Sequence, residues 1–541
     1  MIQTNPVIGD FEANTARIIR YIEQAASSGC DLAVLPELAV SGYPPQDLLE
    51  HEAFLARQDL ALAHLISETS GIGVICGAIT RHTGATGKLL HNSALLFEDS
   101  RILFSTHKRL LPTYDVFDES RYFEPGQTSI PFSYKGVRLG LTICEDIFND
   151  EDSFPHPLYP ANPVADLKKA GMDLLINIAA SPFTIGKQQL RMFIFSQLCR
   201  KHRTPLIYVN QVGGQDSVLF DGASLVLDEN GLLCRQAQSF REEMLIIDTE
   251  LIKGETTPAS PDETGIVYLA LAMGCRDYVR KCGFSQVLLG LSGGIDSALT
   301  CAIACEALGR ENVMGVALPS PYTSEASIED ARQLALHLGI RFEIIPISDS
   351  FDSLRNTLSP LFAERDEDVT EQNIQARIRG TLLMAIANKF SALLLSTGNK
   401  SEMAVGYCTL YGDMAGALSL LSDVPKQLVY ELSRFVNRER EIIPQRTITR
   451  APSAELALNQ KDQDDLPPYE VLDPILKAYL EDHLSIGEIV ALGFEHSVVE
   501  DTVRRIKRNE YKRHQAAMGL KITSKAFGFG RRYPVAQNFK E

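Results

Sequence analysis

The chain has 541 residues, 45% of them hydrophobic and 22% charged, and a formal net charge of −17 at pH 7. This length exceeds what one hydrophobic core ordinarily serves and predicts two large domains. The composition is that of a globular protein, and the acidic excess argues against nucleic acid as a main partner. No apolar stretch has the roughly 20 residues that a membrane-spanning helix needs, and the first residues lack the basic-then-apolar pattern of a secretory signal. We therefore expect a cytoplasmic protein without a membrane or nucleic-acid partner.

The first half of the chain alternates helix-like and strand-like segments. Residues 11–29 place Ile18, Ile22 and Ala26 on one helical face, and Gly29 ends the pattern. Several later segments are apolar on both faces, as central strands covered by helices are. Strands are predicted at residues 31–37, 72–80, 93–97, 137–144, 173–178 and 206–210. The first half is therefore expected to be a layered α/β fold.

The composition changes near the middle of the chain. Residues 253–264, KGETTPASPDET, are poor in apolar side chains and rich in Pro, Thr and Ser, which is typical of a linker between domains. No internal repeat or low-complexity run indicates a further division. The sequence therefore predicts a first domain over residues 1–252, this linker, and a second domain over residues 265–541.

The second half alternates strands and helices in a regular way. Strands are predicted at residues 287–291, 313–318, 341–347 and 392–396. Helices are predicted up to Leu308, from a cap pattern over Ser327 to Asp330, and over residues 374–390. Such alternation indicates parallel βαβ units. In open sheets of this kind, ligands bind beyond the carboxyl ends of the strands.

A short polar sequence, SGGIDS at residues 292–297, lies where the first of these strands passes into its helix. Gly293 and Gly294 can adopt backbone angles closed to other residues and let an anion reach the free N–H groups of the helix start. Ser292 and Ser297 add hydroxyl donors, so the sequence predicts a phosphate site. The spacing G-x-x-x-x-G-K-[ST] is absent, and an acid, Asp296, indicates a divalent cation such as Mg²⁺ beside the phosphates. The alternative is a tight turn in which the helix dipole stabilises Asp296.

Two stretches of the second half resemble known families. LSGGIDS resembles the pyrophosphate-binding loop of ATP pyrophosphatases, and residues 396–426, STGNKSEMAVGYCTLYGDMAGALSLLSDVPK, resemble NAD synthetases in particular. The resemblance implies a Rossmann-like, doubly wound parallel sheet. It also implies that ATP adenylates the nicotinate carboxylate of deamido-NAD and that ammonia then displaces AMP to give NAD, with pyrophosphate as the other product.

The same resemblance assigns ligands to particular residues. For deamido-NAD it implies Asn373, Glu402 and Lys512, and for Mg²⁺ it implies Asp296 and Glu402. Lys512 lies in a basic run that is ordinarily a solvated helix face. Arg377 and Arg379 fit either phosphate contacts or the polar side of a helix. For ATP the resemblance implies Gly290, Leu291, Ser292, Gly293, Gly294, Ile295, Asp296, Ser297 and Thr397.

Three residues of the first half stand at or just after strand ends: Glu37, Lys108 and Cys144. A free thiol is mostly protonated at pH 7, so a nucleophilic cysteine needs a base and a nearby positive charge. Glu37 and Lys108 have the right chemistry for these two roles. Taken singly, each residue also has an ordinary structural explanation, such as a core cysteine or a capping acid. The ten cysteines contain no C-x-x-C pair, so neither a disulfide framework nor a zinc site is indicated.

In their surroundings, VLPELAVSGYPP, THKRLLPTYDVFDESRYFEPG and LGLTICEDIF, these residues resemble the Glu-Lys-Cys triad of the nitrilase superfamily. The closest resemblance is to the glutaminase domain of glutamine-dependent NAD synthetases, which implies an α-β-β-α sandwich. Glu37 would take the thiol proton, Cys144 would attack glutamine, and Lys108 would stabilise the oxyanion. The resemblance adds Tyr114, Ser181, Lys187 and Glu145 on the glutamine side and Glu119 as a supporting acid.

The resemblance extends from QTNPVIGDFEANT near the start to AFGFGRRYP near the end. One departure is that only Met1 and Ile2 precede Gln3, where the family usually opens with a full strand. Membership implies internal transfer of ammonia and a homo-oligomer, a dimer or larger. Two alternatives are an enzyme that adenylates another carboxylate or carbonyl, and a non-enzymatic first half that serves as an oligomerisation scaffold. Residues 396–426 argue against the former, and the triad argues against the latter.

Overall fold

The computed structural model describes residues 1–152, 156–254, 262–363, 365–457, 460–539 and 541, and the chain divides into two compact units, Met1–Pro261 and Asp262–Glu541. Residues 255–261, the middle of the predicted linker, lie outside the described part. Helix α5 (Glu263–Lys281) begins within the range predicted as linker, because the Asp262 side chain caps it by accepting from Gly265 N. Within the described ranges, no helix has both the length and the apolar content needed to cross a bilayer.

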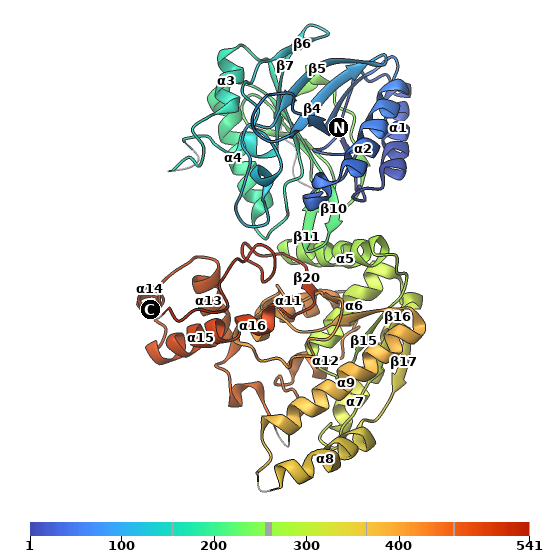
Figure 1. Cartoon of the computed structure of the whole chain (residues 1–541), viewed down its shortest axis with the longest axis vertical. Helices are drawn as coiled ribbons and strands as arrows, with labels where there is room; N and C mark the ends of the chain where they lie inside the picture. The colour runs from blue at the N-terminus through green and yellow to red at the C-terminus, as the bar shows by residue number, and fades with distance from the viewer. Residues whose placement is uncertain (153–155, 255–261, 364, 458–459, 540) are drawn as a thin grey trace. The chain divides into compact units, whose positions relative to one another are not determined.

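The first unit consists of two β-sheets with helices on their outer faces (Figure 1). Helices α1 (Phe11–Ser27) and α2 (Glu52–Ser67) pack on each other and on the four-stranded sheet, whereas α3 (Pro163–Lys169) and α4 (Lys187–His202) contact the six-stranded one. In sheet order the four strands are β2 (Leu32–Val34), β3 (Gly73–Arg81), β4 (Leu90–Glu98) and β5 (Arg101–His107). The six are β13 (Leu233–Gln236), β12 (Leu225–Leu227), β9 (Leu206–Asn210), β8 (Leu174–Ala179), β7 (Val137–Ile143) and β6 (Phe132–Tyr134). This arrangement confirms the expected α-β-β-α sandwich.

Alternation along the strands builds two apolar layers in this unit. Ile75 of β3 packs between the sheets with residues of β7, β8 and β9, whereas Val74 and Cys76 face α1 and α2. Helix α1 presents Ile18, Ile22 and Ala25 to the core, so Ala26, predicted on the apolar face, is exposed instead. Each fully buried aliphatic side chain of this kind stabilises the fold by roughly 1.5–3 kcal/mol.

Short strands complete the first unit, and the sequence did not predict them. β1 (Ile2–Gln3) pairs antiparallel with β14 (Glu243–Met244), and β10 (Val212–Gln215) forms a hairpin with β11 (Val218–Asp221). Each has at most four residues, which is too short for an alternating apolar pattern to stand out. Their position is therefore decided by tertiary pairing.

The second unit contains one six-stranded sheet in which every pair of neighbouring strands is parallel. From β15 the chain proceeds outward to β16 and β17 and then returns to β18 on the other side of β15. This reversal creates a switch point between β15 and β18, where doubly wound sheets bind ligands. In sheet order the strands are β17 (Arg341–Ile344), β16 (Val313–Ala317), β15 (Val287–Gly290), β18 (Leu393–Ser396), β19 (Leu418–Ser419) and β20 (Met518–Gly519). The predicted doubly wound parallel sheet is confirmed.

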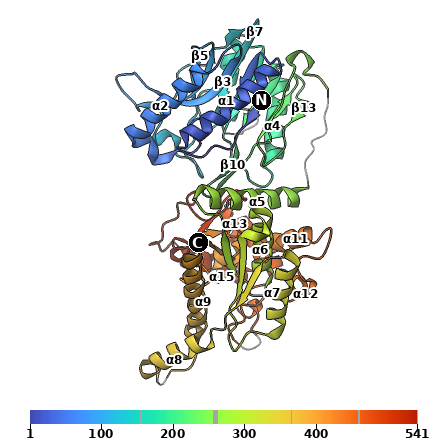
Figure 2. The same ribbon diagram turned by 90° about the vertical axis from the view of Figure 1, so that its right-hand side faces the viewer.

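Helices lie on both faces of this sheet (Figure 2). Helix α6 (Ile295–Leu308) contacts α5, α7 (Glu325–Leu338) and α11 (Lys426–Val436), while α9 (Val369–Phe390) packs on β15 and β18. The remaining α-helices, which no sequence pattern predicted, are α8 (Ser348–Phe362), α10 (Lys400–Val405), α12 (Gln445–Thr449), α13 (Tyr469–Leu480), α14 (Ile486–Ala491), α15 (His496–Arg508) and α16 (Glu510–Arg513).

The start of α7 differs from the prediction. The cap pattern was placed at Ser327 to Asp330, but the N-cap is Ser324, whose hydroxyl accepts from Ser327 N at 3.2 Å. Ser324 is the earlier of two serines with suitable spacing, and the extended backbone at this residue lets it cap the helix. Ser327 thereby becomes a residue of the first turn, with its hydroxyl available for other partners.

Candidate active sites

The structure brings Glu37, Lys108 and Cys144 together in one buried cluster of the first unit. All three side chains are inaccessible or nearly so, and Lys108 Nζ donates to Glu37 Oε1 at 2.8 Å. Lys108 also donates to Glu119 Oε1 at 2.6 Å. Burial raises the pKa of the Cys144 thiol well above its ordinary value, the charge of Glu37 raises it further, and Lys108 opposes this rise. The resting thiol is therefore protonated and needs a base before it can attack.

Two further donors fix the orientation of Glu37. The Asn92 side chain, on β4, donates to Oε1 at 2.7 Å, and Ala180 N, at the end of β8, donates to Oε2 at 2.8 Å. Both donors are neutral and buried, so they stabilise the carboxylate without adding charge. The sequence analysis missed Asn92, because a strand sequence does not show whether a polar side chain donates to a particular acid or only lies in the sheet.

The loop that carries Glu37 crosses β3 at Gly77. A Cβ at Gly77 would lie 2.4 Å from Leu38 N and 2.5 Å from Pro36 O. Gly77→Ala is therefore expected to push this backbone away, to destabilise the first unit by about 1–3 kcal/mol, and to lower glutamine hydrolysis strongly. Thermal unfolding and ammonia release from glutamine would measure the two effects. Gly487→Ala, where an added Cβ meets no atom within 4 Å and the backbone has no positive φ, controls for the added methyl group, and equal losses in both variants would contradict the expectation.

The ammonium group of Lys108 lies between the carboxylates of Glu37 and Glu119. Burial works to lower the pKa of Lys108, but Glu119 and Glu37 outweigh it and raise the pKa well above the ordinary value. Burial raises the pKa of Glu119 to about 7, against the opposing charge of Lys108. Tyr43 donates to the Glu119 oxygen that Lys108 contacts, whereas Glu119 Oε2 has no hydrogen-bond partner among the described residues. A buried carboxyl oxygen without a partner is where a proton or a substrate N–H is most favourable.

A sharp turn presents Cys144. This residue follows β7, has a φ of +43°, and begins a short 3₁₀ helix over Cys144–Ile147. A positive φ is unusual for a residue with a side chain and marks strain that the surroundings maintain. Asp146 holds the turn, because it accepts from Ile143 N at 3.1 Å and from Arg109 N and Leu110 N at 2.9 Å. Asp146, which the sequence analysis missed, therefore ties the Cys144 turn to the segment that carries Lys108.

The residues predicted on the glutamine side border this cluster. Tyr114 and Tyr159 donate to Glu145, at 2.9 Å and 3.2 Å, and burial raises the pKa of Glu145. Ser181 N donates to Asn210 Oδ1 at 2.8 Å. Lys187 begins α4, and its ammonium lies 5.3 Å from the ring centre of Phe148 and lowers the pKa of Glu145. A cation, a phenol and a backbone turn therefore border the cluster that contains Cys144.

Three histidines, His82, His91 and His107, form a cluster of ring contacts, and His107 directly precedes Lys108 in the sequence. His107 stacks on His91 with ring centres 4.1 Å apart, and His82 Nδ1 lies 2.8 Å from His91 Nε2. Burial lowers the pKa of His107 to about 4, with the charges of His91 and His82 adding to this effect. The native protein therefore binds fewer protons here than the unfolded chain, whose histidines titrate near 6.5. The contribution to stability is complete above about pH 6.5 and is lost as the pH falls toward 4.

This linkage predicts a pH effect on the first unit. The urea concentration that removes glutamine hydrolysis is expected to fall between about pH 6.5 and about pH 5. In His107→Gln, which keeps a partner for Ser93 Oγ, the fall should be smaller. The measurement is residual ammonia release after equilibration in urea at each pH, and identical pH dependence in the two proteins would contradict the assignment.

The second unit contains a cavity of about 290 Å³ at the switch point between β15 and β18. The loop at residues 292–297 lines this cavity, and so do Glu402 and Lys426. The other two predicted deamido-NAD ligands hold the loop that follows α10: Asn373 Oδ1 accepts from Thr409 at 2.7 Å, and Lys512 donates to Gly406 O at 2.7 Å. The wall includes the residues predicted to contact ATP, namely Gly290, Leu291, Ser292, Gly293, Gly294, Ile295, Asp296, Ser297 and Thr397.

The glycine loop has the geometry expected of an anion site. Gly293 has a φ of +82°, and a Cβ there would lie 2.3 Å from Ser327 O, so only glycine fits. Gly294 precedes α6, which leaves the first N–H groups of that helix directed out of its start. Gly294 N donates to Ser292 Oγ at 3.1 Å. Ser297 Oγ donates to Gly294 O at 3.0 Å, so hydrogen bonds within the loop help to fix its conformation.

A lysine, Lys426, lies between the two carboxylates predicted to hold Mg²⁺. Its Nζ is 2.5 Å from Asp296 Oδ2 and 3.2 Å from Glu402 Oε1. Burial raises the pKa of Glu402 to about 8, while Lys426 opposes and Asp296 adds to the rise. Lys426 is the first residue of α11 and closes the family-like stretch, but its sequence position gave no sign of a role at the glycine loop.

The carboxylate pair fits a magnesium ion that draws its other ligands from a nucleotide. No group of three or more His, Cys, Asp and Glu side chains among the described residues could hold a metal ion. Mg²⁺ bound with nucleotides commonly uses one or two carboxylates, phosphate oxygens and water. Asp296 and Glu402 both line the cavity beside the phosphate-type loop. Their oxygens supply the hard donors that this ion prefers.

Comparison with known proteins assigns a family to each part of the chain. The carbon-nitrogen hydrolase family profile matches residues 1–258, and the NAD synthase profile matches residues 267–516. The chain is therefore an enzyme that joins a carbon-nitrogen hydrolase to an NAD synthase. It is 47% identical to the glutamine-dependent NAD(+) synthetase of Synechocystis sp., covering 100% of this chain and 98% of that relative. The chain belongs to the family of glutamine-dependent NAD(+) synthetases.

Two further relatives extend the match to other bacteria. The glutamine-dependent NAD(+) synthetase of Acinetobacter baylyi is 43% identical, over 100% of this chain and 98% of its own length. A solved structure of the Acinetobacter baumannii enzyme, in complex with adenosine diphosphate, is 42% identical and superposes with a TM-score of 0.78 over 99% of this chain and 97% of that chain. The predicted family and enzyme class are confirmed, and the full-length match argues against an idle first half.

Proposed function

We propose that this chain makes NAD from deamido-NAD, ATP and glutamine, using Cys144 to release ammonia and the 292–297 loop to bind the ATP phosphates. The observation that carries the proposal is the pair of lysine-centred clusters, one in each unit. Lys108 lies between Glu37 and Glu119, and Lys426 lies between Asp296 and Glu402. The first cluster adjoins a thiol, and the second adjoins a phosphate-type loop.

In the first unit, Glu37 takes the proton from Cys144 Sγ as the sulfur attacks the glutamine carboxamide carbon. Lys108 donates to the oxyanion of the tetrahedral intermediate. Glu37 returns its proton to the leaving nitrogen, so ammonia departs and a thioester remains. Glu37 next takes a proton from water, which attacks the thioester carbon. That proton passes to the departing sulfur, which restores the thiol and releases glutamate.

Binding in the first unit follows from the residues around the thiol. The unpartnered Glu119 Oε2 accepts an N–H of the carboxamide. Lys187 contacts the α-carboxylate of glutamine, and Tyr114 and Glu145 lie beside its amino group. These contacts separate the two charged ends of the amino acid, since Lys187 offers only donors and a carboxylate only acceptors.

In the second unit, the amides of the glycine loop and the Ser292 and Ser297 hydroxyls hold the ATP phosphates, and Thr397 contacts the nucleotide. The nicotinate carboxylate attacks the α-phosphorus, pyrophosphate leaves, and ammonia then displaces AMP from the acyl adenylate. Lys426 directs its charge at the phosphates. Asp296 and Glu402 would hold Mg²⁺, which would neutralise charge on the departing pyrophosphate. Asn373, Glu402 and Lys512 contact deamido-NAD.

The test is NAD production from deamido-NAD, ATP and Mg²⁺ with glutamine or ammonium as separate nitrogen donors. Both donors should support synthesis, with AMP and pyrophosphate formed in equal amounts. Production with neither donor, or formation of ADP in place of AMP, would contradict the proposal. Omission of Mg²⁺ should stop synthesis while glutamine hydrolysis persists.

Internal transfer of ammonia is the remaining part of the proposal. Ammonia is mostly protonated in neutral water, so an enzyme gains by using it before release. Glutamine labelled with ¹⁵N in its amide should give ¹⁵N-labelled NAD even when unlabelled ammonium is in large excess. Label diluted in proportion to the ammonium would show that ammonia passes through the solvent.

A further inference from the structure

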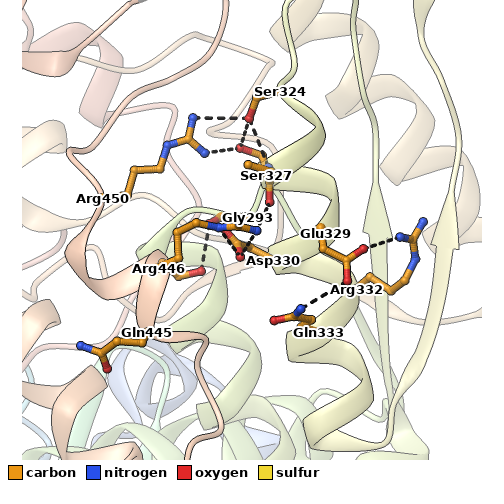
Figure 3. A network of polar contacts seen from close by, with 12 residues as sticks. Gly293, Ser324, Ser327, Glu329, Asp330, Arg332, Gln333, Gln445, Arg446 and Arg450 are labelled. Carbon is orange, nitrogen blue, oxygen red and sulfur yellow. Dashed lines mark hydrogen bonds and ion pairs between the residues drawn. The ribbon is translucent and has the colours of Figure 1, made fainter.

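A carboxylate occupies the start of helix α7 at the edge of the nucleotide cavity. Glu455 Oε1 accepts from Ser327 Oγ at 2.8 Å and from Ser324 Oγ at 3.0 Å, and it forms an ion pair with Arg450. Arg450 Nη1 donates to Ser327 Oγ at 2.6 Å, and Figure 3 shows its guanidinium directed at Ser324 and Ser327. A guanidinium and two serine hydroxyls therefore surround one anion, which the chain itself supplies.

This anion site adjoins the phosphate loop. The backbone of Ser327 lies so close to Gly293 that a Cβ added at Gly293 would be 2.3 Å from Ser327 O. Thr447 Oγ1 also donates to Gly293 O at 3.4 Å. Ser327, Arg450 and Glu455 all line the same cavity as the loop. The glycine loop and the site around Arg450 therefore line one common cavity.

The cavity also carries a second arginine at this position. Arg379 donates through Nε to Leu318 O at 2.9 Å and lines the cavity. Burial lowers the pKa of Arg379 to about 10, and Glu455 is the group that opposes this by its charge. A half-buried guanidinium that is offset by the charge of one carboxylate, Glu455, favours a further anion in the cavity. Arg379 therefore supports a phosphate contact over the polar-face alternative.

We propose that Glu455 occupies the place of the terminal phosphates, and that the pyrophosphate part of ATP displaces it to bind Arg450, Ser324 and Ser327. The proposal rests on the function proposed above and adds Arg450 as a pyrophosphate ligand and Glu455 as its competitor. Without nucleotide, Glu455 balances the charge of Arg450. With nucleotide, the more highly charged pyrophosphate replaces it.

The chain around Glu455 permits this exchange. Helix α12 is fixed to α7 because Arg446 Nε donates to both oxygens of Asp330 at 2.9 Å (Figure 3). Arg450 therefore directly follows an anchored helix. Glu455 lies five residues further along the chain, and its backbone N–H donates to Ser453 Oγ at 3.1 Å. Moving Glu455 out of the site leaves the anchor of α12 intact.

Binding of magnesium pyrophosphate, measured by calorimetry on the full chain without other substrates, tests the proposal. Glu455→Gln keeps the shape of the side chain and removes its charge, so pyrophosphate should bind about tenfold more tightly. Arg450→Met should weaken binding by about tenfold or more. When Glu455→Gln and Arg450→Met are combined, removal of the Glu455 charge should no longer tighten pyrophosphate binding, because Arg450, for which the two anions compete, is gone. A purely structural cap would give lower thermal stability in Glu455→Gln and no gain in affinity.

Glu329 and Arg332 provide the matched control, since they form an exposed ion pair on the same helix (Figure 3). Glu329→Gln and Arg332→Met should leave pyrophosphate binding unchanged. Equal affinity in wild type and Glu455→Gln would overturn the proposal. A protein that binds pyrophosphate as described but makes no NAD would instead contradict the proposed function alone.

Hydrogen exchange on the unaltered chain gives a second measurement that needs no variant. Pyrophosphate should slow exchange at the amides of residues 293–297, which it contacts. It should speed exchange at residues 453–457, because Glu455 is released. Slower exchange in both segments would show that Glu455 stays in place and would overturn the proposal.

Discussion

Cys144→Ala is expected to lower glutamine-driven NAD formation by more than about 10⁴-fold and to leave ammonium-driven formation within about twofold of wild type. Cys144 is the proposed nucleophile of one site, whereas the cavity proposed to bind the nucleotide is lined wholly by residues of the other unit. Removing the sulfur ends thioester formation, but Lys108 keeps both of its carboxylate partners. Initial rates with each nitrogen donor, at saturating ATP and deamido-NAD, measure the effect.

Cys199→Ala is the control for this variant. Cys199 is also fully buried in the first unit, on α4, but the charges that act on its thiol are those of Asp228, Cys234 and Arg200 and not those of Glu37 and Lys108. Its loss should leave the rates with both donors near those of wild type. Equal losses with glutamine and ammonium in Cys144→Ala would mean that one site serves both reactions.

The elements with a strong local signal could be predicted from the sequence. Strands such as β3, β8 and β15 consist mostly of apolar residues because helices or a second sheet cover both of their faces. The glycine loop at residues 292–297 could be predicted as a turn because such a turn needs glycine, and the positive φ of Gly293 bears out this conformation. Short elements such as β10 and α16 carry too few residues for a pattern, so tertiary contacts decide them.

The residues that orient the catalytic groups could not be predicted. Asn92 donates to Glu37, which is 55 residues away in the sequence. Asp146 accepts from the backbone of Arg109 and Leu110, the latter 36 residues away. Lys426 donates to Asp296 across 130 residues. Their residue types are common, and only folding gives them their partners. The sequence could suggest that an acid replaces the usual lysine at the phosphate loop, but a distant lysine restores the positive charge there.

Both sites use the same electrostatic arrangement. Each holds a buried lysine between two carboxylates, and in each the lysine pKa is raised while that of one carboxyl rises, to about 7 for Glu119 and to about 8 for Glu402. One ammonium cannot fully compensate two buried carboxylates, so each cluster keeps an excess of negative charge that favours a proton or a cation. In the first unit this favours proton transfer, and in the second it favours a metal ion beside phosphates.

Asp296→Ala is expected to lower NAD formation by at least about 10²–10³-fold with either nitrogen donor, while glutamine hydrolysis persists. The substitution removes a carboxylate that Lys426 contacts at 2.5 Å and that accepts from Asn399 at 2.9 Å. Lys426 is then left with Glu402, and the cavity loses one of the two acids that fit Mg²⁺. Rates with glutamine and ammonium, together with the Mg²⁺ dependence of ATP binding, measure the loss.

Asp349→Ala separates this effect from the loss of any first-turn acid. Asp349 occupies the first turn of α8, as Asp296 does in α6, but it is exposed and lies outside the nucleotide cavity. Both acids gain the same stabilisation from a helix N-terminus, so a helix-dipole role for Asp296 predicts similar small losses in the two variants. A large loss confined to Asp296→Ala, with weaker Mg²⁺-dependent ATP binding, requires instead that its carboxylate acts on the nucleotide. Near wild-type synthesis in Asp296→Ala would contradict the metal assignment.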